Sequence, residues 1–191
     1  MTTLEALPSQ QLLRIARDSI AHRLSGLAPP TYDSVDPSLR ALAASFVTLT
    51  IEDRLRGCIG SLEPYRPLLD DVQANACAAA FQDPRFPPLT AQDLARVRIE
   101  VSVLSPLERV PAATETEALA RIRPFEDGLV LRHGRQRGTF LPQVWEQLPD
   151  RATFLQHLKL KAGLPSGFWD DRMELYRYSV AHCVEPTPAA P

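Results

Sequence analysis

The chain has 191 residues, of which 45% are hydrophobic and 23% are charged, and its formal net charge is −2. This length and composition are sufficient for a substantial core in one domain or two closely packed lobes. The small net charge gives no electrostatic reason to expect nucleic acid or an anionic membrane as a partner. No apolar run approaches the length of a membrane span, and residues 1–10 lack the basic and apolar regions of a signal peptide.

The sequence contains three cysteines, Cys58, Cys77 and Cys183. An odd number without paired spacing argues against a disulfide framework, because such frameworks need cysteines in pairs. Free thiols persist in a reducing compartment. The cysteine pattern therefore predicts a cytoplasmic protein.

Hydrophobic periodicity and turn residues predict the elements of the first half of the chain. In chain order they are a helix over 9–25 ended by Gly26, an irregular connection over 26–38, a hairpin of strands 45–51 and 54–60 with a turn at Glu52 and Asp53, a helix over 68–81, a capping box from Thr90 to Asp93, and a strand over 98–104. In the first strand of the hairpin, Val47, Leu49 and Ile51 form one apolar face.

The same signals predict the second half. In chain order they give a helix over 114–122, a strand over 129–131, a hairpin tip at His133 and Gly134, a return strand over 135–141, helical structure over 143–147, a helix from an N-cap at Asp150 to a stop at Gly163, a strand over 173–184, and a disordered tail over 185–191.

The return strand of the first hairpin carries the residues with the most chemistry. Strict alternation predicts that Leu55 and Ile59 face the core, and that Arg54, Arg56 and Cys58 share the opposite face. Cations near a thiol favour the thiolate, which is its nucleophilic form. This arrangement indicates a reactive or ligand-contacting cysteine, with Cys58 and Arg56 as the candidate catalytic residues.

Other residues near this strand are candidates for ligand binding. Gly57 and Gly60 allow close approach of a ligand or of another stretch of backbone. Charged groups complete the set, and the full list of candidate ligand-binding residues is Arg54, Gly57, Gly60, Glu63, Asp83 and Arg85. Each carboxylate, and also Glu100, has an alternative role as an ion-paired anchor for an arginine.

Neither a metal site nor a Cys–His pair is indicated by the spacing of residues. The sequence has no C-x-x-C or H-E-x-x-H pattern, so no metal and no cofactor are expected. None of the four histidines, His22, His133, His157 and His182, is tied to Cys58 by its spacing. A structural role for Cys58, as a small strand residue covered by a helix, therefore stays open beside the reactive one.

The two predicted hairpins resemble each other. Arg54-x-Arg56-Gly57-Cys58-Ile59 matches Arg135-x-Arg137-Gly138-Thr139-Phe140 in residue type and order. This match predicts an α+β fold of two repeated hairpin–helix–strand units, approximately 9–105 and 114–184, with antiparallel or mixed sheets and flanking helices.

The hexapeptide Leu55-Arg56-Gly57-Cys58-Ile59-Gly60 resembles the signature of the AMMECR domain family at every position. Further blocks match in the family's order: Asp83-Pro84-Arg85-Phe86-Pro87-Pro88-Leu89-Thr90, Ile99-Glu100-Val101-Ser102-Val103-Leu104-Ser105, Leu141-Pro142-Gln143-Val144 and Lys161-Ala162-Gly163-Leu164. One departure is Trp145, where many relatives have a smaller residue.

This resemblance implies a single domain over 1–184 with a larger and a smaller lobe, and a functional region at Arg56, Gly57, Cys58 and Gly60. Bacterial and archaeal members are called AmmeMemoRadiSam system protein A, which implies a Memo-like protein and a radical SAM protein as partners. Two functions follow as hypotheses. One is a thiol-dependent component of a modification system, in which Arg56 activates Cys58. The other is a non-catalytic binding or scaffolding module that recognises an anionic ligand or a partner peptide.

Overall fold

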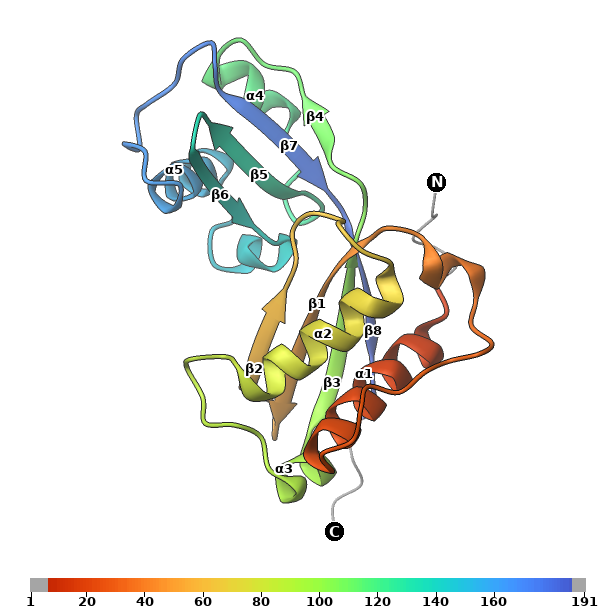
Figure 1. Cartoon of the computed structure of the whole chain (residues 1–191). Helices are drawn as coiled ribbons and strands as arrows, with labels where there is room; N and C mark the ends of the chain where they lie inside the picture. Colours follow the sequence, from red (N-terminus) through yellow and green to blue (C-terminus); the bar gives the residue numbers. More distant parts are fainter. Residues whose placement is uncertain (1–6, 187–191) are drawn as a thin grey trace. The chain divides into compact units, whose positions relative to one another are not determined.

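The computed structural model describes residues 7–186 and divides the chain into two compact units (Figure 1). Unit 1 contains the chain up to Ser105 and again from Ala181 onward, and unit 2 contains Pro106–Val180. Each unit has one four-stranded sheet with helices, so the fold is α+β, as predicted. Within residues 7–186, no helix is long and apolar enough to cross a membrane.

The sheet of unit 1 has the strand order β2-β1-β3-β8. Its strands are β1 (Ala44–Ile51), β2 (Arg54–Gly60), β3 (Arg98–Leu104) and β8 (Val180–Val184). Its helices are α1 (Ser9–Leu24), the 3₁₀ helix η2 (Pro37–Arg40), α2 (Leu68–Phe81) and α3 (Ala91–Arg96). β1 pairs antiparallel with both β2 and β3, which leaves β2 at one edge of the sheet.

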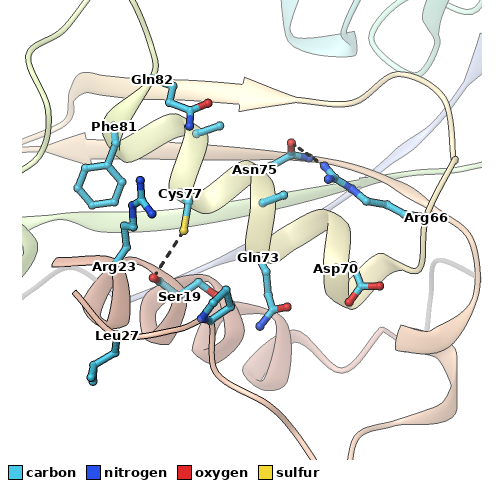
Figure 2. A pocket seen from close by; sticks show the side chains of 13 residues that line it. Ser19, Arg23, Leu27, Arg66, Asp70, Gln73, Asn75, Cys77, Phe81 and Gln82 are labelled. Carbon is cyan, nitrogen blue, oxygen red and sulfur yellow. Dashed lines mark hydrogen bonds between the residues drawn. The ribbon is translucent and has the colours of Figure 1, made fainter. Parts of the chain in front are cut away.

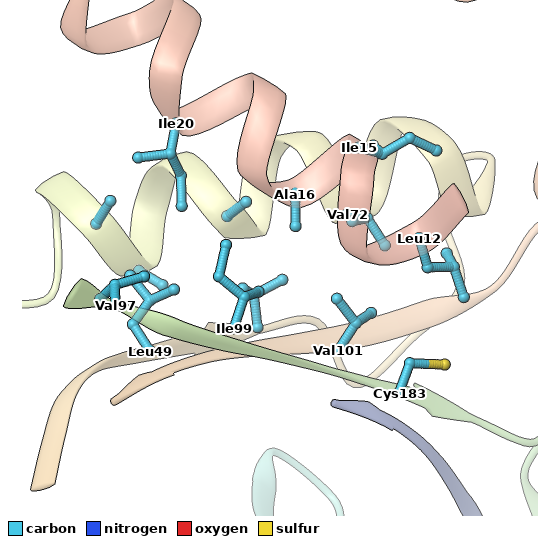
Figure 3. Packing of buried hydrophobic residues seen from close by; sticks show 14 of the residues in the cluster. Leu12, Ile15, Ala16, Ile20, Leu49, Val72, Val97, Ile99, Val101 and Cys183 are labelled. Atoms are coloured by element: carbon cyan, nitrogen blue, oxygen red, sulfur yellow. The ribbon is translucent and has the colours of Figure 1, made fainter. Parts of the chain in front are cut away.

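The core of unit 1 lies between this sheet and the pair α1 and α2 (Figure 3). The strands contribute the residues that alternation predicts, including Val47, Leu49 and Ile99, which are fully buried. The facing side of α2 carries Val72 and a run of alanines. Because alanine side chains are short, the helix backbone can approach the sheet closely.

The sheet of unit 2 has the order β4-β7-β5-β6. Its elements are β4 (Glu108–Val110), α4 (Glu115–Arg121), β5 (Gly128–His133), β6 (Gln136–Phe140), the 3₁₀ helix η3 (Pro142–Glu146), α5 (Arg151–Lys161) and β7 (Glu174–Tyr178). Its core centres on Trp145, whose ring stacks on Phe154 with centroids 3.7 Å apart. The indole N–H is also satisfied, because it donates to the carbonyl of Asp127 at 2.8 Å. Trp145 is therefore a fully buried core residue.

The predicted turns and helix ends are confirmed. Glu52 and Asp53 both have positive φ, as the tight turn between β1 and β2 requires. Thr90 and Asp93 form the reciprocal capping box of α3. Asp150 caps α5 through the N–H of Thr153 at 2.9 Å, and Gly163 ends that helix with a φ of +79°.

Two predictions near the C-terminus are wrong. Residues 173–184 form two strands rather than one, since β7 ends at Tyr178 and β8 begins at Val180, in the sheet of the other unit. Glu185 does not begin a disordered tail. Its N–H donates to the carbonyl of Ile99 at 3.0 Å, and its carboxylate accepts from Arg17. Residues 187–191 of the expected tail lie outside the described residues.

The two units have corresponding strand orders. In each sheet the hairpin strands are followed by the strand that comes after the helix, giving β2-β1-β3 in unit 1 and β6-β5-β7 in unit 2. β8 and β4 occupy the remaining edges. Descent from one duplicated segment stays a prediction, for which this shared topology is a structural counterpart.

Candidate functional site

A β-bulge changes which residues of the hexapeptide share a face. Leu49 is opposite Gly57, but the next residue, Thr50, is opposite Leu55, so Arg56 is an extra residue in β2. Leu55 is consequently moved off the core side and is 43% exposed. The prediction that Leu55 faces the core is wrong, because strict alternation takes no account of an inserted residue.

The bulge also separates Arg54 from Cys58. Arg54 is opposite Ile51, on the side of β1 that faces the helices, and it is exposed at the hairpin tip. Cys58 is opposite Thr48, on the outer side of the sheet. The predicted common face for these two residues is therefore wrong.

The two glycines of the hexapeptide accommodate close packing within the protein. A Cβ at Gly57 would lie 2.1 Å from the carbonyl oxygen of Ala79, which belongs to the backbone of α2. A Cβ at Gly60 would lie 2.2 Å from the ring of Phe46. Of the two explanations that the sequence left open, approach by other parts of the chain accounts for both glycines, and ligand binding at either stays a prediction.

The main chain of Cys58 is held on both sides by Asp83 and Arg85. The N–H of Cys58 donates to Oδ2 of Asp83 at 2.9 Å, and its carbonyl accepts from Arg85 Nη2 at 3.3 Å. Since β2 is an edge strand, these bonds satisfy groups that would otherwise form part of an open sheet edge. We call Asp83 and Arg85 the edge clamp.

The edge clamp is itself an ion pair, with Arg85 Nη2 2.7 Å from Asp83 Oδ2. The Asp83 side chain is 2% exposed, whereas that of Arg85 is 54% exposed. Hydrogen bonds from Arg85, together with those from the backbone N–H groups of Cys58 and Arg85, hold the pKa of Asp83 far below its usual range. The same partnership raises the pKa of Arg85.

The guanidinium of Arg56 binds the segment that follows α2. It donates to the carbonyls of Pro87 at 2.8 Å and Pro88 at 3.3 Å, and it pairs with Asp93 at 3.3 Å. The guanidinium is thus engaged in anchoring this segment to β2. Activation of Cys58 by Arg56 stays a prediction, and these contacts provide a structural role for the arginine.

The Cys58 side chain lies in a row of polar residues across the outer face of the sheet. The hydroxyl of Thr48 donates to Cys58 Sγ at 3.3 Å, and the thiol is half-buried. Thr48 is in turn opposite Glu100 of β3, so Cys58, Thr48 and Glu100 occupy matching positions on three adjacent strands.

The row ends in a cluster of Glu100, Ser102 and His182. Nδ1 of His182 lies 2.9 Å from Glu100 Oε1 and 3.1 Å from Ser102 Oγ. The hydrogen bond with His182 lowers the pKa of Glu100. Both of these contacts engage Nδ1, and neither engages the other ring nitrogen, Nε2. We call Cys58, Thr48, Glu100, Ser102 and His182 the outer-face row.

Much of this row is not evident from the sequence. The sequence indicates Glu100 as a partner for arginines, and it shows no link between His182 and Cys58. The Glu100–His182 contact joins residues 82 positions apart, and it depends on the pairing of a strand that returns from the end of the chain. The sequence carries one signal for the row. Small or polar residues, Thr48 and Cys58 in the hairpin and Glu100 and Ser102 in β3, alternate with the apolar residues of their strands.

The other chemical candidates lie elsewhere. Glu63 is exposed in the segment after β2. Cys77 is half-buried on α2, where burial raises the pKa of its thiol, and Cys183 is buried with its Sγ 3.2 Å from Ser9 Oγ. All three cysteines are free thiols, as predicted. Within residues 7–186, no three His, Cys, Asp or Glu side chains are grouped to hold a metal ion.

The fold and the hairpin site define a two-unit α+β protein with a half-buried cysteine on one sheet face. Residues 13–183 match the sequence profile described as AMMECR1, and the chain therefore belongs to the AMMECR1 family. This confirms the resemblance that the hexapeptide and the other sequence blocks carry.

Archaeal relatives are similar over most of their length. A protein of Nanoarchaeum equitans is 37% identical over 168 residues, covering 86% of this chain and 93% of the relative. A protein of Methanocaldococcus jannaschii is 36% identical over 180 residues, covering 92% and 89%. The crystal structure of uncharacterized protein PH0010 from Pyrococcus horikoshii superimposes with a TM-score of 0.85 at 32% identity, covering 96% of this chain and 94% of that one.

Proposed function

We propose that this AMMECR1-family protein is a thiol-dependent component of a modification system, and that Cys58 is the residue that contacts the substrate. The observation that carries this proposal is the division of labour within the hexapeptide. Arg56, Gly57 and Gly60 each have a packing or anchoring contact, whereas the thiol of Cys58 is held at a fixed backbone position and lies on the outer face.

The fixed backbone of Cys58 supports a chemical role. The edge clamp bonds both its N–H and its carbonyl, so the backbone that carries the thiol cannot be displaced without breaking hydrogen bonds to charged groups. Such pre-organisation is what a reacting group needs, because misplacement by an ångström is costly in rate.

The outer-face row supplies a candidate proton acceptor for the same substrate. Cys58 and Glu100 are two strands apart, which corresponds to about 10 Å in a sheet. This separation rules out direct proton transfer from the thiol to the His182–Glu100 pair. A substrate lying across the strands would contact Cys58 at one end and Nε2 of His182 at the other.

The decisive experiment measures the rate at which iodoacetamide alkylates each cysteine, resolved by peptide mass spectrometry. We expect Cys58 at pH 7 to react faster than free cysteine, and Thr48→Val to slow it by removing the hydrogen bond to sulfur. Thr50→Val, on the same face of β1 but opposite Leu55, is the matched control and should leave the rate unchanged. A wild-type rate no faster than that of free cysteine would refute the reactive thiol.

The partners belong to this proposal through the family resemblance, which implies a Memo-like protein and a radical SAM protein. Co-purification of both with the wild-type chain, and also with Cys58→Ser, would agree with a thiol that acts after assembly. Loss of a cellular phenotype in Cys58→Ser, with folding and partner binding intact, is the expected companion result. Failure to bind either protein would remove the partners from the proposal and leave the thiol to be judged by its alkylation rate.

A non-catalytic binding module is the second candidate, and one observation favours it. Arg85 is more than half exposed beside Cys58, and its guanidinium lies 5.4 Å from the centre of the Phe86 ring. Nε and Nη2 of Arg85 bond Asp83 and the carbonyl of Cys58, and the N–H groups of Nη1 are the ones suited to donate to an anionic ligand or an acidic peptide. If Arg85→Gln abolishes partner binding while Cys58→Ser has no effect on partner binding or phenotype, the binding module is the better description.

A further inference from the structure

Unit 1 also contains a cavity suited to a ligand, and the hexapeptide does not line it. A cavity of about 600 Å³ lies between α1, the segment that follows it, and the outward side of α2 (Figure 2). Its volume is in the range of pockets that hold small organic molecules. None of the residues that line it belongs to the hexapeptide or to the outer-face row.

The walls of the cavity are fixed by the fold. Gly26 ends α1 with a φ of +69°, which turns the chain back toward α2. The side chain of Gln73 then donates to the carbonyl of Pro30 at 2.7 Å, and Nδ1 of His22 lies 3.0 Å from the carbonyl of Ala28. These contacts hold the connecting segment in place, so the cavity does not depend on a side chain moving aside.

One end of the cavity combines a cation with an apolar wall. The side chain of Arg23, in the last turn of α1, has no hydrogen-bond or ion-pair partner within residues 7–186, and the residue is exposed. Ala78 and Phe81 of α2 line the same cavity, and so does Leu27, which is 59% exposed. A ligand that covered Leu27 would remove an exposed apolar surface from water.

The other end carries no net attraction for anions. The guanidinium of Arg66 is 2.8 Å from the buried carboxylate of Asp71, which offsets its charge. Asp70, which also lines the cavity, is exposed and negative. A polyanion that extended along the cavity would therefore meet repulsion at this end, which leaves a single anionic group at Arg23 as the favourable arrangement.

Cys77 lies between the two ends and provides a reporter for occupancy. Its Sγ donates to the carbonyl of Ser19 at 3.6 Å across the cavity, as the dashed line in Figure 2 shows. Burial raises the pKa of the Cys77 thiol, and the charge of Arg23 opposes part of that rise. Arg23 is thus close enough for its charge to act at the centre of the cavity.

We propose that this cavity is a binding site for a small monocarboxylate with an apolar or aromatic body. The planar guanidinium of Arg23 would take the carboxylate through two parallel hydrogen bonds, a geometry that arginine provides and lysine does not. The body of the ligand would lie against Ala78, Phe81 and Leu27. This site is independent of the proposed chemistry at Cys58.

The test uses benzoate as the probe and the full chain as the receptor, followed by amide chemical shifts and by alkylation of Cys77. Benzoate should shift amides of α2 near Cys77 and Phe81, and at about four times its Kd it should slow alkylation of Cys77 about fivefold. Alkylation of Cys58 should not change. Benzamide, which has the same ring without the charge, and inorganic phosphate should both bind at least about tenfold more weakly.

Arg23→Gln should weaken benzoate binding about tenfold or more, because a charge-assisted pair is lost. Arg14→Gln is the matched control on the same helix, since Arg14 is exposed and pairs with Asp18 instead. Absence of benzoate-dependent shifts, phosphate binding as tightly as benzoate, or equal weakening by the two variants would each overturn the proposal. A thermal melt of Arg23→Gln that matches the wild type ensures that its loss of binding is not a loss of fold.

Discussion

In the β1–β2 hairpin Gly57 lies beneath the backbone of α2, and in the β5–β6 hairpin Gly138 lies beneath that of α5. A Cβ at Gly57 would be 2.1 Å from the Ala79 carbonyl, and one at Gly138 would be 2.9 Å from the Leu158 carbonyl. Both units therefore use a glycine to bring a helix into contact with the outer strand of a hairpin. The closer approach is in unit 1.

The hairpins differ at the residue that follows the glycine. In unit 2 this residue is Thr139, whose hydroxyl donates to the carbonyl of Leu129 at 2.8 Å and lies 3.2 Å from the Tyr178 hydroxyl. In unit 1 it is Cys58, which receives a hydrogen bond from Thr48 and whose backbone is held by the edge clamp. The glycine serves packing in both hairpins, and the residue that follows it is where the side-chain contacts of the two hairpins differ.

The largest effect that we expect is a loss of stability on replacing a buried carboxylate, and this loss should differ between the two units. Asp71 is fully buried and accepts from Ser45, Ser61, Arg66 and Asn75. Asp71→Asn should lower the free energy of unfolding by about 3–5 kcal/mol, because it leaves buried donors without their charged partner.

Asp127 of unit 2 is the counterpart, and it accepts from Arg123, whose side chain is 50% exposed. Asp127→Asn should cost less, about 1–3 kcal/mol, because water can solvate the released arginine. Urea unfolding followed by circular dichroism measures both variants. A larger loss for Asp127→Asn than for Asp71→Asn would contradict this ranking.

The next effect concerns the glycines themselves. Gly57→Ala should destabilise the protein by about 3 kcal/mol, at the upper end for overpacking, because the atom in the way is a backbone oxygen. Gly138→Ala should cost about 1–2 kcal/mol, since a smaller helix shift relieves the contact.

Fluorescence can assign these losses to units. The chain has two tryptophans, and both Trp145 and Trp169 belong to unit 2. Gly57→Ala should therefore lower the midpoint seen by circular dichroism more than the midpoint seen by tryptophan fluorescence, whereas Gly138→Ala should lower the fluorescence midpoint. Equal stability losses for the two alanine variants would mean that the tighter contact in unit 1 carries no extra constraint.

A smaller effect is the contribution of the edge clamp to stability, and this contribution should depend on pH. The pKa of Asp83 is lowered in the folded state, so its contribution to stability is complete above the unfolded pKa, about 4, and is lost as the pH falls toward the folded value. Asp83→Asn should cost about 2 kcal/mol at pH 7 through the lost charged hydrogen bonds. The difference from the wild type should shrink at pH 3.

Urea midpoints at pH 7 and pH 3 measure this difference. Asp70→Asn, which alters an exposed carboxylate on α2, is the control and should stay within about 0.5 kcal/mol of the wild type. A wild-type-to-variant difference that stays constant or grows on acidification would contradict the assigned role of Asp83.

The smallest effect exchanges the residue types that distinguish the hairpins. Thr139→Cys should destabilise the protein by about 1 kcal/mol, because it weakens the hydrogen bonds to Leu129 and Tyr178. The thiol introduced at position 139 should be alkylated no faster than free cysteine, in contrast to Cys58. Thr139→Ser keeps the hydroxyl and serves as the stability control. Equally fast alkylation at both positions would show that the surroundings of Cys58 are not special.

The local parts of this architecture could be read from the sequence. Val47 and Leu49 alternate with threonines and are buried as predicted, and the capping box at Thr90 and the stop at Gly163 depend on residues within one turn of a helix. These signals act over short stretches of chain, so periodicity and turn chemistry are sufficient to find them.

The parts that could not be read involve breaks in periodicity or long-range pairing. The bulge at Arg56 places Leu55 and Arg54 on the sides of the sheet opposite to those predicted, and the alternation of residue types does not indicate a bulge. At Ser179 the chain passes from one sheet to the other without any break in the pattern. The contact of His182 with Glu100 depends on that passage, which is why the outer-face row emerged with the structure alone.

The place of β8 beside β3 has a consequence for the order of folding. β3 ends at Leu104 and its neighbour begins at Val180, so the first sheet cannot be completed until the residues of β8 have left the ribosome. Unit 2 needs only the residues between these strands. Because closing a long loop slows folding, we expect unit 2 to form first and the pairing of β3 with β8 to be the late step. During that interval β3 is an open sheet edge, and it is there that the nascent chain is most exposed to aggregation.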